Sequence, residues 1–307
     1  MYRYKVPGCC HLTEKKGMTE MSLSDRPKNL RLLAVVAHPH DITHMCGTLA
    51  HHVSDGDAVT AVSVTGGLHT HRQRLYDEMR KPPGERDLSV LQESDEEYEH
   101  RKASEFRQVC ALFGISDARI LPFPDWPWKL SDELVQALTE IILEVRPDIV
   151  LTHAPKAQFN HGWVSLLPQD DPHSGTGRAT HLAISCAGMP DDARKRQTHA
   201  VAAVLYTGVD LPIEQADIFI DITDQAANRI KAEKLFTTQD HTAEFANKRI
   251  QIGAGFTGWT CGASYAEAWV RARPQFARRI DLTDQEVERN AIPSVEYLAR
   301  VGKVIME

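Results

Sequence analysis

The chain has 307 residues, of which 42% are hydrophobic and 25% are charged, and these values exclude a disordered chain or a fibrous repeat. Its formal net charge of −7 argues against a nucleic-acid-binding surface, because contacts to phosphates need clustered Lys and Arg side chains. No apolar run approaches the length of a membrane span, and the N-terminal residues lack the apolar core of a signal peptide. We therefore expect a cytoplasmic protein that binds neither nucleic acid nor a membrane.

The six cysteines are scattered along the chain, and none of them forms a Cys-x-x-Cys pair. Neither a disulfide framework nor a thiolate zinc site is therefore indicated. We expect reduced thiols that are mostly buried.

The first elements follow a polar N-terminal segment. Residues 1–30 are mixed in charge and without periodicity, which is typical of a tail or of an arm on a partner subunit, and we expect a homo-oligomer. Residues 32–37 form a continuous apolar run, as in a strand that is buried on both faces. A helix is predicted over residues 43–54 and ends before Gly56, and a β-branched run predicts a second strand over residues 57–65.

The middle of the chain alternates between helix and strand signals. Residues 68–92 are polar and contain Pro82 and Pro83, so an irregular excursion is predicted there. Ser94 and Glu97 form a capping-box pattern that opens the next helix. The further predicted elements are helices over 94–113, 131–145, 177–187 and 224–236, and strands over 119–123, 148–152, 202–206 and 217–222.

This alternation predicts βαβ units, and hence an α/β, Rossmann-like fold with a mostly parallel sheet and helices on both faces. We assign residues 31–270 to one domain and residues 271–307, which include a capping box at Thr283 and Glu286, to a C-terminal extension. In such sheets the ligand site lies beyond the carboxyl ends of the strands, so the loops there are the place to look for chemistry.

The loop after the first strand contains three side chains that can bind a metal. His38, His40 and Asp41 offer imidazole nitrogens and a carboxylate oxygen, which are ordinary ligands of a catalytic zinc ion. Pro39 stiffens the turn and lowers the entropy lost on fixing two ligands. The alternative is that the histidines only bond to backbone carbonyls. The cluster at this position favours a metal site.

The sequence resembles the LmbE-like (PIG-L) zinc N-deacetylase family, which opens with Ala-His-Pro-Asp-Asp-Glu and a Gly-Gly-Thr-Leu-Ala helix. The resemblance runs in order over most of the chain from Arg31 to Trp269. The matching segments are Ala37 to Asp41, Gly47 to Ala50, Thr65 to Gly67, Arg101 with Glu105, Phe123 to Asp125, Arg146 to His153 and Tyr265 to Trp269.

The resemblance implies one zinc ion per chain, with His38 and Asp41 as two of its ligands. The third ligand of the family is the last histidine of a His-Pro-Asp-His motif at the start of a helix, and this sequence has no such motif. We assign His181, because His181-Leu182-Ala183 fits the family pattern on that helix. His161 and His173 are the competing candidates.

Two departures from the family concern the reaction. His40 stands where the family has its general-base aspartate, and Ile42 stands where the family has a glutamate. A histidine can accept a proton near neutral pH, so we predict that His40 is the general base. His40 as a further metal ligand and a degenerate site are the alternatives.

Other polar residues near the strand ends are expected to act on the substrate. His173 is predicted to protonate the leaving amine or to stabilise the tetrahedral oxyanion, the role of the first histidine in the family motif. The residues predicted to contact substrate are His69, His71, Arg101, Asp125 and Trp126.

The sequence thus predicts a metal-dependent hydrolase that uses an activated water to cleave the amide bond of an N-acyl amine or N-acetyl amino sugar. The long segments 68–92 and 155–180 favour a small non-sugar amide as the rival substrate. A non-catalytic metal- or ligand-binding protein on a degenerate site is an alternative of a different class. A nucleotide-binding Rossmann protein is disfavoured, because the first loop lacks the glycines that let a backbone approach a pyrophosphate.

Overall fold

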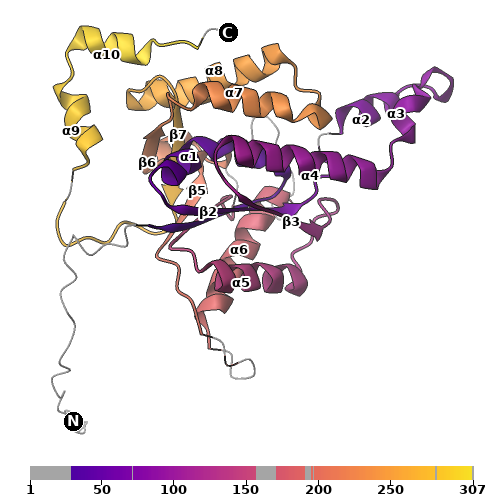
Figure 1. Cartoon of the computed structure of the whole chain (residues 1–307), viewed down its shortest axis with the longest axis horizontal. Coiled ribbons are helices and arrows are strands. Elements are labelled where there is room, and N and C mark those ends of the chain that lie inside the picture. The colour runs from indigo at the N-terminus through magenta and orange to yellow at the C-terminus, as the bar shows by residue number, and fades with distance from the viewer. Residues whose placement is uncertain are drawn as a thin grey trace, which may run out of the picture.

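The computed structural model describes residues 29–70, 72–156, 171–190, 195, 197–280 and 282–305. In this part of the chain, a seven-stranded sheet lies between two layers of helices, with α1, α4, α7 and α8 on one side and α5 and α6 on the other (Figure 1). The strand order is β3-β2-β1-β4-β5-β7-β6. Strand β7 is antiparallel to both of its neighbours, and the other pairs are parallel. The predicted fold class is therefore confirmed.

The described elements have the following bounds. The strands are β1 (Arg31–Val36), β2 (Ala58–Thr65), β3 (Asp117–Phe123), β4 (Ile149–Thr152), β5 (Ala203–Thr207), β6 (Ile218–Asp221) and β7 (Ala266–Arg271). The helices are α1 (Cys46–Ser54), α2 (Gln73–Arg80), α3 (Leu88–Gln92), α4 (Asp95–Leu112), α5 (Asp132–Val145), α6 (Pro172–Gly188), α7 (Ala226–Leu235), α8 (Ala243–Cys261), α9 (Asp284–Ala291) and α10 (Ser294–Val301). A 3-10 helix, η2 (Pro39–His44), follows β1.

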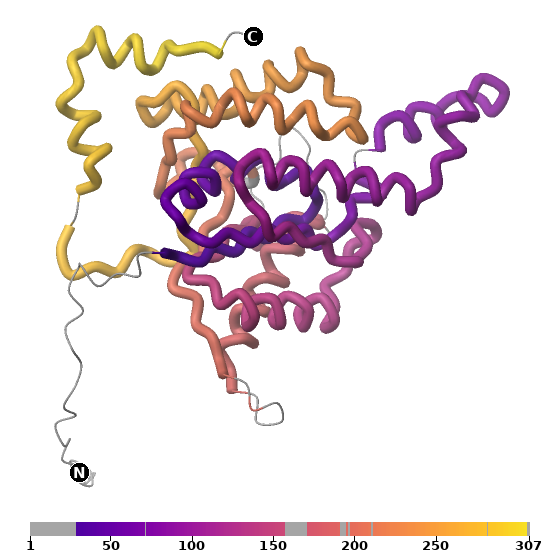
Figure 2. Tube along the Cα trace, viewed as in Figure 1, coloured from indigo at the N-terminus to yellow at the C-terminus, as the bar shows by residue number. Residues whose placement is uncertain are grey.

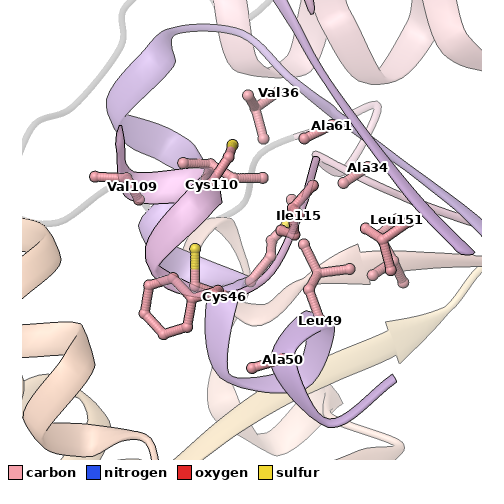
Figure 3. Close-up of a cluster of buried hydrophobic side chains, with 14 of the residues drawn as sticks. Ala34, Val36, Cys46, Leu49, Ala50, Ala61, Val109, Cys110, Ile115 and Leu151 are labelled. Carbon is pink, nitrogen blue, oxygen red and sulfur yellow. The ribbon is translucent and has the colours of Figure 1, made fainter. Parts of the chain in front are cut away.

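Strand β1 is buried because its alternate side chains enter two separate cores. Leu32 and Val36 pack with the side chains of α1 and α4, where Cys46 and Cys110 also lie (Figure 3). Leu33 points to the opposite face and packs with α5 and α6. Burying one Leu or Val side chain contributes roughly 1.5–3 kcal/mol to stability. The two cores fix the position of β1, and therefore of the loop that follows it.

The structure corrects three details of the predicted elements. The polar segment 68–92 is not wholly irregular, because it contains α2 and α3, which protrude from the body of the protein (Figure 2). Both helices are short and neither has a buried residue, so packing against the core does not determine them. The helix predicted over 177–187 begins earlier, at Pro172, and α8 and β7 were not predicted as elements.

The C-terminal residues contact the sheet and α8. Val301 is buried, the Arg300 guanidinium lies 3.2 Å from an Asp221 carboxylate oxygen, and the backbone N–H of Ile305 donates to the Tyr265 hydroxyl at 3.1 Å. The domain boundaries at 30 and 270 stay a prediction, and residues 1–28 of the expected tail lie outside the described residues. No helix in the described ranges is both long and apolar enough to span a membrane.

Candidate metal centre

The turn after β1 holds His38 and Asp41 together. His38 is the N-cap of η2, and its backbone N–H donates to Asp41 Oδ2 at 2.8 Å, which closes a capping box. Pro39 occupies the first turn, where its missing N–H costs no hydrogen bond. Both side chains are buried, and His38 Nδ1 lies 3.2 Å from Asp41 Oδ2. The local sequence therefore places an imidazole nitrogen beside a carboxylate oxygen.

A third side chain reaches this pair from α6. His173 Nε2 lies 3.4 Å from Asp41 Oδ2, and one ligand atom from each of His38, Asp41 and His173 lies within 4.8 Å of the others. Two imidazoles and one carboxylate suit a catalytic zinc ion, which takes three protein ligands and keeps one position open. These three residues are called the His38 centre below.

Helix α6 approaches the sheet closely because it is glycine-rich near its start. A Cβ atom at Gly177 would lie 2.5 Å from the backbone oxygen of His153, so only glycine fits there. The Asp171 side chain accepts from the Ser174 backbone N–H at 3.1 Å and caps the helix. The cap and the close approach together place His173, in the first turn, over the end of β1.

The charge state of the His38 centre suits a cation. Burial raises the pKa of Asp41, but the facing His173 and His38 outweigh it and hold that pKa well below its usual value. Burial lowers the pKa of His38, although Asp41 opposes this effect. A carboxylate and a neutral imidazole are the protonation states in which these groups bind metals.

The Nε2 side of the His38 ring is linked to a second carboxylate, that of Asp125, through the Thr70 hydroxyl. His38 Nε2 lies 3.1 Å from the Thr70 hydroxyl, which donates to Asp125 Oδ2 at 2.8 Å. If Nε2 carries the proton and donates to Thr70, the Nδ1 lone pair faces Asp41 and His173. Such hydrogen bonds behind a ligating histidine fix its tautomer and orientation.

The loop that carries Thr70 is fixed by a buried lysine. Lys102 Nζ donates to the backbone oxygens of Gly67 and Thr70 at 3.0 and 2.9 Å. Burial lowers the pKa of Lys102 to about 8, and Asp125 and Asp41 oppose that shift. The lysine thus ties α4 to the loop behind His38.

Removing the Thr70 hydroxyl should weaken metal binding without removing a ligand. We expect Thr70→Val to reduce zinc affinity about 10- to 100-fold, the usual cost of losing a partner of a ligating histidine. Thr60→Val is the matched control, because Thr60 also donates to an aspartate, Asp117, at 3.0 Å, in a pair without a histidine. Zinc titration against a competing chelator measures both affinities. Equal affinities in the two variants would contradict the role of Thr70.

His181, the expected third ligand, lies elsewhere. Its Nε2 atom is 2.6 Å from the Tyr206 hydroxyl, and it is not among the residues that converge at the His38 centre. It follows His173 by about two turns of the same helix. His173, and not His181, is therefore the candidate for the third ligand position, and the role predicted for it as proton donor stays a prediction. The competing candidate His161 lies outside the described residues.

His40 is also placed away from the His38 centre. Its Nε2 atom lies 2.8 Å from Glu233 Oε2, and its ring packs edge-on against Phe236 and His241. Burial lowers the pKa of His40 to about 4, and Glu233 opposes that shift. These contacts put His40 in a second cluster, so neither of its predicted roles, as base or as ligand beside His38, is supported by its position.

The residues expected to contact substrate fall into different surroundings. Asp125 is buried, and its oxygens accept from His69 and Thr70, so it holds the loop that carries these two residues. The His69 side chain is 50% exposed, and its Nδ1 lies 3.0 Å from Asp125 Oδ1. Trp126 is exposed, and the half-exposed Arg101 on α4 pairs with an oxygen of Glu93, the C-cap of α3, at 2.7 Å. His71 lies outside the described residues.

One sequence signal could have identified His173. The family ligand stands at the start of a helix, and Asp171-Pro172 is an N-cap followed by a proline in the first turn. This pair starts α6 at Pro172 and places His173 in its first turn. Glu233 and His241, by contrast, follow no recognisable motif.

Sequence comparison supports the same region. The family model described as PIG-L, GlcNAc-PI de-N-acetylase, matches residues 33–184, which include His38, Asp41 and His173. A 1D-myo-inositol 2-acetamido-2-deoxy-alpha-D-glucopyranoside deacetylase from Thermomonospora curvata is 26% identical over 259 residues, which are 76% of this chain and 81% of the relative.

Solved structures share the fold. The N,N'-diacetylchitobiose deacetylase from Pyrococcus horikoshii has a TM-score of 0.63 at 20% identity and covers 78% of this chain and 82% of its own. GalB, the 4-carboxy-2-hydroxymuconate hydratase from Pseudomonas putida, also has a TM-score of 0.63, at 17% identity, and covers 82% of this chain and 100% of its own. Because these two proteins catalyse different reactions, the shared fold alone does not assign one.

Proposed function

We propose that this chain is a member of the PIG-L family of N-deacetylases and a metal-dependent hydrolase that removes the acyl group from an N-acyl amine. The observation that carries this proposal is the convergence of His38, Asp41 and His173 within 4.8 Å at the carboxyl end of β1. Zinc is the ion that we assign, one per His38 centre, because nitrogen and carboxylate ligands suit it.

Each residue near the centre has a distinct task in this proposal. His38, Asp41 and His173 would hold the ion, and Thr70 with Asp125 keeps the His38 ring oriented. When bound, zinc supplies polarisation of a carbonyl oxygen and activation of water. In the overall reaction, water adds to the amide carbonyl, the C–N bond breaks, and a carboxylate and an amine leave. We assign substrate contact to His69, which is half exposed beside Thr70.

An N-acetyl amino sugar is the substrate class that we propose. The Thermomonospora curvata relative is named for an acetamido sugar joined to inositol, and it aligns with most of this chain. A small non-sugar amide is the rival, which we keep because of the long segments 68–92 and 155–180. The expected homo-oligomer and cytoplasmic location stay predictions.

Metal removal combined with a substrate panel tests the function. We expect the purified full-length chain to release free amine from N-acetylglucosaminyl-inositol or another N-acetyl amino sugar, detected with an amine-reactive fluorophore. Chelation should abolish the release, and added Zn²⁺ should restore it, because the ion supplies several kcal/mol of transition-state stabilisation. A zinc-loaded chain that releases no amine from sugar or non-sugar amides would instead support a non-catalytic binding protein.

A further inference from the structure

A second group of metal-ligating side chains lies on the α7 side of η2. His40 Nε2 is 2.8 Å from Glu233 Oε2, and His241 Nδ1 is 3.2 Å from the same oxygen. One ligand atom from each of the three residues lies within 4.8 Å of the others. We call these three residues the His40 cluster.

Two atoms of the His40 cluster have unsatisfied bonding capacity. His241 Nδ1 and Glu233 Oε1 are buried and have no hydrogen-bond partner among the described residues. Buried polar atoms normally have a partner, and an absent ion is one reason for an exception. His241 Nδ1 lies 3.2 Å from Glu233 Oε2, a separation that two ligand atoms of one cation can have.

We propose that the His40 cluster is a second divalent-metal site, with zinc as the ion that its ligands favour. Two imidazoles and one glutamate are a regular zinc ligand set, distinct from the two imidazoles and one aspartate of the His38 centre. No part of this inference depends on the proposed activity.

The surroundings of the His40 cluster determine which ion it can take. Glu233 is fully buried, and Phe236 and Phe245 pack against the rings of His40 and His241. The Arg249 guanidinium lies 3.5 Å from Glu233 Oε1. Both histidines face the second oxygen of this carboxylate, Oε2. The two phenylalanine rings offer no oxygen ligands, and Arg249 partly neutralises the Glu233 carboxylate. These surroundings disfavour hard ions that need many oxygen ligands, such as Ca²⁺ and Mg²⁺.

The two sites are connected through one short helix. His40 lies between His38 and Asp41 in the chain, and all three residues belong to η2 or to its cap. A cation bound by His40, Glu233 and His241 would tie η2 to α7 and to the segment before α8. The second metal therefore has a structural role, which is to hold in place the turn that presents the ligands of the first.

Zinc stoichiometry tests this inference. The full-length chain is stripped with a chelator, titrated with Zn²⁺, separated from free ion and analysed for bound metal. We expect two equivalents in the unaltered protein and one in His241→Ala, with affinity at the altered site at least about 100-fold weaker, because a direct ligand contributes more than its supporting partner. Glu233→Gln, which keeps the side-chain shape, should also bind one equivalent.

A matched control separates this cluster from ordinary histidine–carboxylate pairs. His51→Ala removes a histidine that lies 2.9 Å from an Asp224 oxygen at the surface of α1, and it should retain two equivalents. Two equivalents in His241→Ala would overturn the proposal. If the unaltered protein binds a single equivalent and Asp41→Ala loses it, the second metal site is also overturned, but the proposed deacetylase is not. If the unaltered protein binds no zinc, the second metal site and the proposed deacetylase are both overturned.

Discussion

Asp41→Ala is expected to lose the metal of the His38 centre and to reduce amide hydrolysis by at least about 1000-fold, because that ion supplies several kcal/mol of transition-state stabilisation. Asp41 Oδ2 lies 3.2 Å from His38 Nδ1 and 3.4 Å from His173 Nε2, so its loss removes the group that both imidazoles face. Metal analysis and amine release on the same preparation measure both effects.

Asp41 also closes the capping box of η2, so a second variant is needed to separate structure from chemistry. Loss of such a cap costs about 1 kcal/mol of stability. Asp41→Asn retains an oxygen that can accept the His38 N–H but lacks the negative charge, and it should fold like the unaltered chain and still lose this metal. If Asp41→Ala retains as much tightly bound zinc as the unaltered protein, Asp41 is not a ligand.

The parts of the fold that sequence could predict are those with two buried faces. Strand β1 is an apolar run whose side chains enter both cores. Such a run is typical of a strand that is buried on both faces of a sheet, so its sequence predicts this structure. Helix α8 gave no comparable signal, because its buried residues are mostly small and Phe256 and Trp259 are exposed. Its position depends on packing against α7 and β7, which no local pattern encodes.

Some residues of the candidate site could be predicted from the sequence, and others could not. His38 and Asp41 are close in the chain and share one turn, so their proximity could be predicted from sequence. Their partner in α6 is distant in sequence, and spacing within the helix cannot determine which histidine points to the sheet. The position of His40 is a tertiary effect as well, because the contact with Glu233 on α7 directs its ring away from Asp41.

His173→Ala and His181→Ala form a matched pair on α6, and they should differ strongly. We expect His173→Ala to lose the metal of the His38 centre together with at least about 1000-fold in turnover, for the same reason as Asp41→Ala. His181→Ala removes a hydrogen bond to Tyr206 at 2.6 Å, so it should lose only about 1 kcal/mol of stability and keep its zinc. Bound zinc, turnover and thermal unfolding measured on both variants distinguish the two roles. The reverse pattern, with zinc lost only in His181→Ala, would restore His181 as the ligand and would mean that α6 is shifted along its axis in the metal-bound protein.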